Sequence, residues 1–543
     1  VFWRYFFMDK FTMILAQVNV VVGDISGNAT RIIDICSQAK AKFDSEFVVF
    51  PELALTGYPP EDLLFRGDFI RKAENELTRI RNEIVVTAIV GHPCRNIGVL
   101  YNAASVLGGG KLLARYYKRH LPNYSVFDEK RYFSPGEGPC VFNIDGLNIG
   151  LTICEDIWHE GPVEESVKAG ANILVNINAS PYHIEKANER ELNVVSVKAK
   201  QSNVPIVYLN MVGGQDELVF DGGSFVSDNT GNITHRARSF DEEIFTVCFN
   251  SKLIPVKGYV TSMLSTDASI YKALMIGVRD YVNKNRFRGA IVGLSGGIDS
   301  ALTLAIAVDA LGAENVEAIM MPSRYTRSIS KEDAILEAQN LGISYRIVEI
   351  DDLFNLFVQQ LRPVFDGREE DTTEENIQAR IRGTLLMAIS NKTGSIVLTT
   401  GNKSEIAVGY STLYGDMVGG FSAIKDIPKM LVYELAKYRN KLSPVIPERV
   451  FSRAPSAELA PDQEDQQSLP NYEILDGILK LYVEDDKTIE DIVEKGYDRE
   501  TVEDIVLRVT KNEYKRRQAA PGVRISKRAF GRDRRYPITS FFI

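Results

Sequence analysis

The stretch AIVGLSGGIDSALTL, residues 290–304, determines the fold expected for the second half of this 543-residue chain. Its first residues, Ala290 to Val292, form a short apolar, β-branched run that is typical of a buried strand. A glycine turn and an apolar helical stripe follow directly. Because Gly296 and Gly297 carry no Cβ, a phosphate can approach their backbone. The free N–H groups and the positive dipole end at the start of such a helix predict an anion site.

Three functional interpretations compete for this turn. A Walker A loop is excluded, because no Gly-Lys-Ser/Thr follows at the required spacing. A serine-hydrolase elbow matches residues 293–297, but that fold needs its histidine after the serine, and the last histidine of the chain is His235. The six residues SGGIDS instead resemble the pyrophosphate-binding loop of the ATP-pyrophosphatase family. A glycine turn without a ligand is the plain structural alternative.

Three blocks follow this turn. Residues 375–391 predict a helix with Arg380 and Arg382 in its first half, as phosphate contacts or as ordinary helix-surface charges. Residues 396–416 predict a strand that runs into a polar turn. Residues 511–538 form a basic tail, which alone could be a nucleic-acid patch, but the acidic chain favours a small phosphate-rich ligand. The polar residues of the turn are Thr399, Thr400, Asn402 and Glu405.

A second group of chemically useful residues lies in the first half of the chain. Glu52 follows the apolar run FVVF, and Cys154 follows the run IGLTI, so both stand where strands end and side chains converge. Lys118 lies between them in YYKRHLPNY. A carboxylate can take a thiol proton, and an ammonium favours a thiolate and stabilises an oxyanion. The plain alternatives are a packed core cysteine and two solvated charges.

These segments resemble the nitrilase, or carbon–nitrogen hydrolase, superfamily, which hydrolyses amides or nitriles with a Glu–Lys–Cys triad. The resemblance covers about residues 13–249, with the signature segments in the family's order. It implies an α-β-β-α sandwich with Cys154 as nucleophile, Glu52 as general base and Lys118 as oxyanion stabiliser. Glu129 is the candidate for an auxiliary glutamate. The residues that match the family's glutamine contacts are Tyr124, Ser180 and Lys186.

SGGIDS and the blocks after it resemble NAD synthetases, and with the nitrilase-like half in front the whole chain, apart from its first few residues, resembles the glutamine-dependent NAD synthetase family. This resemblance implies a doubly wound, Rossmann-like second domain. It also implies that the carboxylate of deamido-NAD attacks ATP, giving an adenylate and pyrophosphate. Ammonia from glutamine hydrolysis at Cys154 then displaces AMP to form NAD. Because ammonia in neutral water is mostly protonated, we expect a channel that keeps it dry.

The same resemblance assigns roles in the second domain. Asp299 and Glu405 are the candidate Mg²⁺ ligands, since carboxylates suit that hard ion. Deamido-NAD is expected to contact Asn376, Glu405 and Lys515. The resemblance further implies a homo-oligomer. The residues expected to contact ATP are Gly293, Leu294, Ser295, Gly296, Gly297, Ile298, Asp299, Ser300 and Thr400.

Composition limits the class of protein. Apolar residues make up 45% of the chain and charged residues 25%, which is ordinary for a globular protein of two to four domains. The net charge of −9 argues against general nucleic-acid binding. No apolar run approaches the roughly 18 residues of a membrane span. Five cysteines without a CxxC motif argue against disulfides or a zinc site, so we expect a reducing, cytoplasmic location.

The alternation of strands and helices predicts the domain limits. Residues 8–250 are expected to form a layered α/β domain, 251–266 a linker without strong periodicity, and 267–543 the doubly wound domain. Val1 to Phe7 are interpreted as an extension before the fold, with an interface strand as the less favoured alternative. Helices are expected at 29–43, 162–169 and 375–391. Strands are expected at 13–20, 47–50, 85–91, 103–107, 149–154, 173–178, 206–210, 290–294, 316–321, 345–350 and 395–400.

Two polar segments predict loops. Residues 366–375 are acidic and residues 457–469 are rich in Pro, Asp, Gln and Ser, so solvated connections are the plain interpretation and a lid over the ATP site is the alternative. Two rival functions also stay open at this stage. Another acceptor, such as a nucleotide, an amino acid or a tRNA, could replace deamido-NAD. An interaction protein with two inactive sites is disfavoured by the complete residue sets.

Overall fold

The structure is a computed structural model that describes residues 10–144, 146–461, 463, 465–540 and 542. The chain forms two compact units. The N-terminal unit runs to Gln215 and includes Val219–Leu264, and the C-terminal unit comprises Asp216–Leu218 and everything from Ser265 onward. The sequence analysis did not foresee that residues 216–218 group with the C-terminal unit. The interpretation of Val1 to Phe7 lies outside the described residues, and the exact domain limits stay a prediction.

The N-terminal unit contains two six-stranded sheets. Their strand orders are β14-β1-β2-β3-β4-β5 and β13-β12-β9-β8-β7-β6. The strands are β1 (Lys10–Gln17), β2 (Phe47–Val49), β3 (Thr87–Asn96), β4 (Val99–Gly108), β5 (Lys111–Tyr117), β6 (Cys140–Ile144), β7 (Leu147–Ile153), β8 (Ile173–Asn178), β9 (Ile206–Asn210), β12 (Phe225–Ser227), β13 (Ile233–Arg236) and β14 (Glu243–Asn250). A separate hairpin joins β10 (Val212–Gln215) to β11 (Leu218–Asp221).

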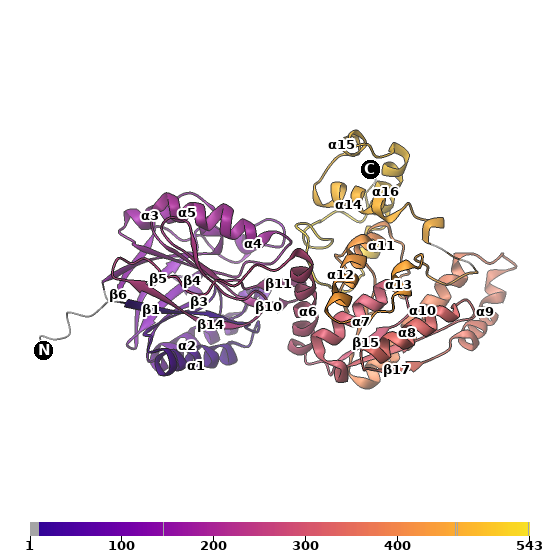
Figure 1. Cartoon of the computed structure of the whole chain (residues 1–543), viewed down its shortest axis with the longest axis horizontal. Coiled ribbons are helices and arrows are strands. Elements are labelled where there is room, and N and C mark those ends of the chain that lie inside the picture. The colour runs from indigo at the N-terminus through magenta and orange to yellow at the C-terminus, as the bar shows by residue number, and fades with distance from the viewer. Residues whose placement is uncertain (1–9, 145, 462, 464, 541, 543) are drawn as a thin grey trace, which may run out of the picture. The chain divides into compact units, whose positions relative to one another are not determined.

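The core of this unit lies between the two sheets. Met13 and Val49 from one sheet pack in the same buried cluster as Ile153 and Val175 from the other. Helices cover both outer faces, with α1 and α2 on one side and α3 and α5 on the other (Figure 1). The expected α-β-β-α sandwich is therefore confirmed. The helices are α1 (Ile25–Phe43), η1 (Glu61–Phe65), α2 (Gly67–Glu83), η2 (Glu129–Arg131), η3 (Cys154–Trp158), α3 (Pro162–Lys168), α4 (Lys186–Asn188), η4 (Glu189–Val195) and α5 (Ser196–Ser202).

The C-terminal unit is built on a parallel sheet of order β17-β16-β15-β18-β19. The chain runs outward from β15 through β16 to β17, then returns to place β18 on the other side of β15. This reversal makes β15 the topological switch point, where ligands bind beyond the strand ends. The expected doubly wound sheet is confirmed. The strands are β15 (Ala290–Gly293), β16 (Val316–Met320), β17 (Ser344–Ile347), β18 (Ile396–Thr399) and β19 (Phe421–Ser422).

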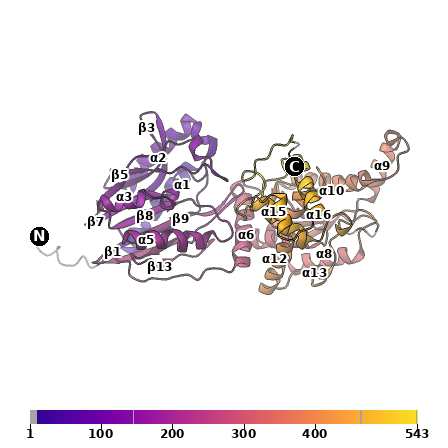
Figure 2. The ribbon, with the colours of Figure 1, turned by 90° about the horizontal axis from the view of Figure 1, so that it is seen from above.

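Helices cover this sheet and extend beyond it. Ile291, Ile319 and Val397 of the sheet pack in one cluster with Phe354 and Ile381. The last helices form a core of their own around Leu475, Val502 and Val506, and Figure 2 shows α15 beside α16, well apart from α9. The helices are α6 (Thr266–Lys284), α7 (Ile298–Leu311), η5 (Ala313–Asn315), α8 (Ser328–Asn340), α9 (Asp351–Phe365), α10 (Thr372–Thr393), α11 (Lys403–Val408), α12 (Lys429–Leu442), α13 (Arg449–Ser452), η6 (Asp465–Gln467), α14 (Tyr472–Leu479), η7 (Lys480–Glu484), α15 (Ile489–Glu494), α16 (Arg499–Lys511) and α17 (Glu513–Arg516).

Two boundaries differ from the sequence predictions because capping side chains start helices early. Helix α1 begins at Ile25 rather than at residue 29, since the Asp24 side chain accepts a hydrogen bond from the N–H of Gly27. Residues 366–375 are not all loop, because Asp371 and Glu374 form a capping box that starts α10 at Thr372. Residues 457–469 are irregular apart from η6, and 462 and 464 lie outside the described residues.

Membrane insertion finds no support in the part of the chain that is described. None of its helices combines the length and the apolar character that crossing a bilayer requires.

Candidate functional site

Glu52 lies in the turn after β2, and three donors hold its carboxylate. Its Oε1 accepts hydrogen bonds from Lys118 Nζ and from Asn102 Nδ2, both at 2.7 Å, and its Oε2 accepts one from the N–H of Ala179 at 2.9 Å. Glu52 and Lys118 are buried, with 1% of each residue exposed. The structure therefore brings together two of the residues that the sequence placed 66 positions apart.

Glu129 is a second carboxylate on the same ammonium. Its Oε1 accepts hydrogen bonds from Lys118 Nζ at 2.8 Å and from the Tyr58 hydroxyl at 2.9 Å. Burial raises the pKa of Glu129 to about 7, although Lys118 opposes this rise. The pKa of Lys118 lies well above its ordinary value, because Glu129 and Glu52 outweigh the effect of burial. The ammonium is therefore charged at neutral pH and shared by two carboxylates.

Cys154 stands at the end of β7 in a left-handed backbone conformation, with φ of 47°. Such a conformation is strained for a residue other than glycine, and strain of this kind clusters at functional sites. Burial and the charge of Glu52 raise the pKa of the Cys154 thiol well above its ordinary value, against the opposing charge of Lys118. The resting thiol is thus protonated, and a nucleophilic role needs a base beside it.

Asp156 ties the cysteine turn to the segment that carries Lys118. Its Oδ2 accepts hydrogen bonds from the N–H of Ile153 at 3.0 Å and from the Tyr116 hydroxyl at 2.9 Å. Its Oδ1 accepts one from the N–H of His120 at 2.8 Å. Burial raises the pKa of Asp156 to about 6. One carboxylate therefore holds both the backbone just before the candidate nucleophile and the backbone just after Lys118.

The three residues expected to bind glutamine have distinct surroundings. The hydroxyl of Tyr124, which is exposed, donates to the carboxylate of Glu155 at 3.1 Å. Lys186 Nζ lies 3.8 Å from the ring centroid of Trp158, in cation–π geometry. The N–H of Ser180 donates to Asn210 Oδ1 at 2.9 Å. The charge of Cys154 is among the smaller influences on the pKa of both Tyr124 and Lys186.

In the C-terminal unit, the turn after β15 has the expected strand–turn–helix geometry. Ser295 Oγ accepts a hydrogen bond from the N–H of Gly297 at 3.2 Å and lies 3.0 Å from Ser300 Oγ. Gly296 has a φ of 81°, and a Cβ there would collide with the carbonyl oxygen of Ser330. Helix α7 begins directly after the turn, at Ile298. The backbone N–H groups at the helix start therefore face the edge where ligands of such sheets bind.

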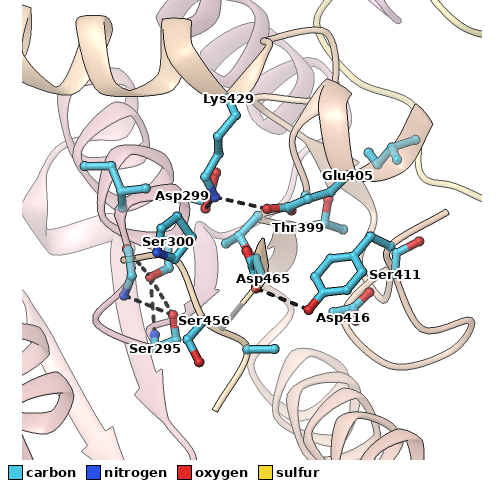
Figure 3. A pocket seen from close by; sticks show the side chains of 18 of the residues that line it. Ser295, Asp299, Ser300, Thr399, Glu405, Ser411, Asp416, Lys429, Ser456 and Asp465 are labelled. Atoms are coloured by element: carbon cyan, nitrogen blue, oxygen red, sulfur yellow. Dashed lines mark hydrogen bonds and ion pairs between the residues drawn. The ribbon is translucent and has the colours of Figure 1, made fainter. Parts of the chain in front are cut away.

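Two carboxylates converge on one ammonium beside this turn. Lys429 Nζ donates to Asp299 Oδ2 at 2.6 Å and to Glu405 Oε1 at 3.0 Å, as Figure 3 shows. Asn402 Nδ2 holds the other oxygen of Asp299 at 2.8 Å. Burial raises the pKa of Glu405 to about 7, while Lys429 opposes the rise. Asp465 adds a further acidic side chain to the same pocket.

Two adjoining cavities, of about 230 Å³ and 260 Å³, surround these groups. Ser295 and Thr400 line both cavities. The first is also lined by Gly297, Ile298, Asp299, Ser300 and Glu405. The second is also lined by Gly293 and Leu294. Of the predicted ATP contacts, only Gly296 does not reach a cavity wall, because it packs against Ser330.

Asn376 and Lys515 lie just behind the cavity wall. Asn376 Oδ1 accepts a hydrogen bond from the Thr412 hydroxyl at 2.8 Å. Lys515 Nζ donates to the carbonyl oxygens of Gly409 and Ser411, both at 2.8 Å. Neither side chain is among those that line the two cavities. Both nevertheless hold the segment 409–416, which supplies Tyr410, Ser411 and Asp416 to the first cavity.

The two arginines of α10 have different surroundings. Arg382 lines the second cavity and donates from Nε to the carbonyl oxygen of Met321 at 3.0 Å. Burial lowers the pKa of Arg382 to about 10. Arg380 is exposed and donates to the carbonyl oxygen of Leu413. The structure therefore favours a ligand contact for Arg382 and a surface position for Arg380.

Several residues of both sites were missed by the sequence analysis. Lys429 carried a local signal, since a lysine at the start of a helix opposes the dipole and needs another reason to be there. Asp156 lies only two residues after Cys154, close to a residue that the sequence singled out. Asn102 and Asp465 gave no local signal. Their roles depend on contacts between residues far apart in the chain.

Comparison with known proteins agrees with this division. The carbon-nitrogen hydrolase family matches residues 15–255, and the NAD synthase family matches residues 270–519. The glutamine-dependent NAD(+) synthetase of Acinetobacter baylyi is 50% identical over 98% of this chain and 99% of its own length. The chain belongs to the glutamine-dependent NAD(+) synthetases. It is accordingly an enzyme that amidates deamido-NAD to NAD, with ATP as a substrate and glutamine as the amide donor.

Other members of the glutamine-dependent NAD(+) synthetases show the same relation. The Thermotoga maritima enzyme is 45% identical over 98% of this chain and 99% of its own length. The solved synthetase of Acinetobacter baumannii, in complex with ADP, is 47% identical over 97% of this chain and 98% of its own, with a TM-score of 0.80. The synthetase structure from Cytophaga hutchinsonii, at 20% identity and a TM-score of 0.84, shares the fold over 98% of both chains.

Proposed function

We propose that glutamine is hydrolysed in the N-terminal unit by Cys154, Glu52 and Lys118, and that deamido-NAD is adenylated at the cavities beside β15. The observation that carries this proposal is the buried Glu52–Lys118 pair, at 2.7 Å, whose charges act on the thiol of a strained cysteine at a strand end. The second site is supported by the glycine turn at the switch point of the doubly wound sheet.

The glutaminase step follows from the protonation states of the triad. The Cys154 thiol attacks the side-chain amide carbonyl of glutamine, and Glu52 takes the thiol proton. Lys118 Nζ stabilises the developing oxyanion. The C–N bond breaks as Glu52 returns the proton to the leaving nitrogen, which gives ammonia and a thioester. Water then hydrolyses the thioester to glutamate. The raised pKa of Cys154 supports this order, because a neutral thiol needs the base at the moment of attack.

The synthetase step needs a leaving group on a carboxylate. The carboxylate oxygen of deamido-NAD attacks the α-phosphorus of ATP, and the bond to pyrophosphate breaks. Ammonia then attacks the activated carbonyl carbon and AMP leaves. We assign the turn residues Ser295 to Gly297 and the start of α7 to the ATP phosphates, because their N–H groups suit an anion. Lys429 is further assigned to developing phosphate charge, since its ammonium lies in the cavity wall.

The donor set beside the turn fits Mg²⁺. The carboxylates of Asp299 and Glu405 line the first cavity on either side of Lys429 Nζ, and nucleotide sites hold Mg²⁺ with one or two carboxylates while phosphates and water supply the rest. Among the described residues no group of three or more His, Cys, Asp or Glu side chains forms an all-protein cage. Bound there, Mg²⁺ would neutralise phosphate charge and orient the phosphates for displacement.

A cysteine exchange tests the division of labour. Cys154→Ala is expected to abolish NAD formation from glutamine, because the nucleophile is gone, while NAD formation with added ammonium salt continues. Steady-state kinetics with each nitrogen source measure this. Cys94→Ala, which removes another buried thiol of the same unit, is the matched control and should retain both activities. Loss of both activities in folded Cys154→Ala protein would refute the two-site scheme.

Three further expectations stay predictions. These are the direct transfer of ammonia to the second site, assembly into a homo-oligomer and a cytoplasmic location. Sedimentation or light scattering of the purified chain tests the assembly into a homo-oligomer.

A further inference from the structure

Arg190 is a buried cation that the triad chemistry does not use. It lies in η4, with 2% of the residue exposed. Its Nη1 pairs with Asp221 Oδ1 at 2.6 Å. Its Nε donates to Ser180 Oγ at 3.1 Å, and its Nη2 donates to the carbonyl oxygens of Ser180 at 2.7 Å and Pro181 at 2.9 Å. Three of its four hydrogen bonds therefore hold the segment that carries Ser180.

The other polar atoms of Ser180 are also engaged. Its N–H donates to Asn210 Oδ1 at 2.9 Å, and its carbonyl oxygen accepts from Arg190 Nη2 and, at 3.3 Å, from Asn210 Nδ2. A guanidinium has donors and no acceptor. Ser180 Oγ must therefore be the acceptor in its contact with Arg190. The hydroxyl hydrogen is left to point toward another acceptor, either the buried hydroxyl of Tyr208, which it reaches here, or a bound ligand.

We propose that Arg190 is a positioning residue that fixes Ser180 as a hydrogen-bond donor to the α-carboxylate of glutamine. This inference rests on the proposed function and on the sequence prediction that Ser180 contacts glutamine. A carboxylate offers only acceptors, so it matches a hydroxyl whose lone pair is already occupied. Lys186, a cation that is also expected to contact glutamine, suits the same carboxylate.

The surroundings explain why an arginine stands here. An amide such as that of Asn210 can turn over and accept instead of donate, whereas a guanidinium cannot. Its planar fork reaches the side chain and the main chain of Ser180 at once. Asp221, only 2% exposed, keeps the pKa of Arg190 above its ordinary value although burial opposes the charge. The guanidinium of Arg190 therefore stays charged and acts only as a hydrogen-bond donor.

The test separates positioning from mere support of the fold. Arg190→Lys keeps the charge opposite Asp221 but loses the fork. We expect the KM for glutamine to rise roughly tenfold, as for the loss of one charged hydrogen bond. Ser180→Ala is expected to give a similar rise. In the Ser180→Ala background, Arg190→Lys should change the KM less than twofold, because the hydroxyl that it orients is absent.

A matched control uses an arginine of β13 that pairs with the same helix. Arg236 pairs with Glu191 of η4, and its guanidinium also donates to the carbonyl oxygen of Thr261 rather than to Ser180. Arg236→Lys is expected to leave the KM for glutamine unchanged. Should Arg190→Lys not fold, Arg190→Met with Asp221→Asn removes both charges together, and the same rise in KM is expected.

The outcomes distinguish this inference from the proposed function. An unchanged KM in Arg190→Lys, or a full additional rise in the Ser180→Ala background, overturns the inference while Cys154→Ala still loses glutamine use. Retention of glutamine use by Cys154→Ala overturns the proposed function itself. The rate of Cys154 alkylation by iodoacetamide, measured in each variant, should stay at the wild-type value, and a large change would show that Arg190 supports the pocket as a whole.

Discussion

Single buried side chains in this enzyme make the free energy of unfolding depend on pH. Glu337 of α8 is 1% exposed, and its Oε1 has no hydrogen-bond partner. Burial, with a smaller contribution from Asp333, raises the pKa of Glu337 from 4.5 to about 8. In the unfolded chain the same group ionises near its ordinary value. Between these two pKa values the folded state therefore holds a proton that the unfolded state has lost.

The sign of this linkage gives a stability prediction. The contribution of Glu337 to the free energy of unfolding is fully present below its unfolded pKa and is lost as pH rises toward the folded pKa of about 8, on the order of 5 kcal/mol in all. Glu337→Gln, which stays neutral, should therefore become increasingly more stable than wild type as pH rises from 5 to 9. Thermal unfolding of both proteins across this range measures the gap. A gap that does not change with pH would contradict the expectation.

Asn102 gives the second prediction at the residue scale. Its amide donates to Glu52 Oε1 at 2.7 Å, and Lys118 and the N–H of Ala179 also hold that carboxylate. Asn102→Ala should lower kcat/KM for glutamine roughly tenfold, because the base loses one of its three orienting bonds. The rate with ammonium salt should not change. Asn143→Ala, on the surface of the same unit, is the control, and an equal loss there would refute the interpretation.

At the scale of elements, the turn between β15 and α7 depends on one glycine. Gly296 combines a positive φ with a backbone contact that leaves no room for a Cβ, whereas a Cβ at Gly297 would meet only Ser295 Oγ at 3.4 Å. Gly296→Ala should therefore destabilise the C-terminal unit by about 2 kcal/mol or more and abolish ATP binding. Gly297→Ala should cost much less stability. Thermal unfolding with and without ATP compares the two, and equal costs would contradict this reading of the turn.

The same turn shows what sequence reasoning can reach. Its strand, glycines and helix start are local features, so SGGIDS predicted the geometry of Ser295 and Asp299 correctly. The ammonium of Lys429 was not predicted, because it lies 130 residues from Asp299 in the chain. Several antiparallel strands were missed for a related reason. β14 is defined by its pairing with β1, where Met13 faces Val247, rather than by any strong alternation of its own.

The candidate site of the N-terminal unit likewise has residues that could be predicted from the sequence and residues that could not. Glu52 and Cys154 follow apolar strands, so their positions at strand ends could be predicted. Asn102 and Arg190 could not, because they act through hydrogen bonds between distant segments and carry no motif. The predicted start of α1 lies four residues too far along the chain, although Asp24 is a recognisable N-cap in the sequence.

At the scale of the whole molecule, the chemistry requires ammonia to reach an activated carboxyl group before it is protonated. Nitrogen is proposed to be released beside Cys154 in one unit, and the adenylate to form beside Asp299 in the other. Water around either site would convert the product of the first reaction into ammonium, which is no nucleophile. Two sites in one chain gain from this arrangement only if the ammonia does not mix with solvent.

A scavenging experiment tests that requirement. Glutamate dehydrogenase with 2-oxoglutarate and NADPH, added in excess, removes free ammonia from the solution. Wild-type enzyme supplied with glutamine should form NAD at an unchanged rate, because its ammonia never reaches the solvent. Cys154→Ala supplied with a low concentration of ammonium salt should lose its activity under the same conditions, which proves that scavenging is effective. If the wild-type rate falls in parallel with the variant, ammonia passes through free solution, and the two sites share a chain without sharing their intermediate.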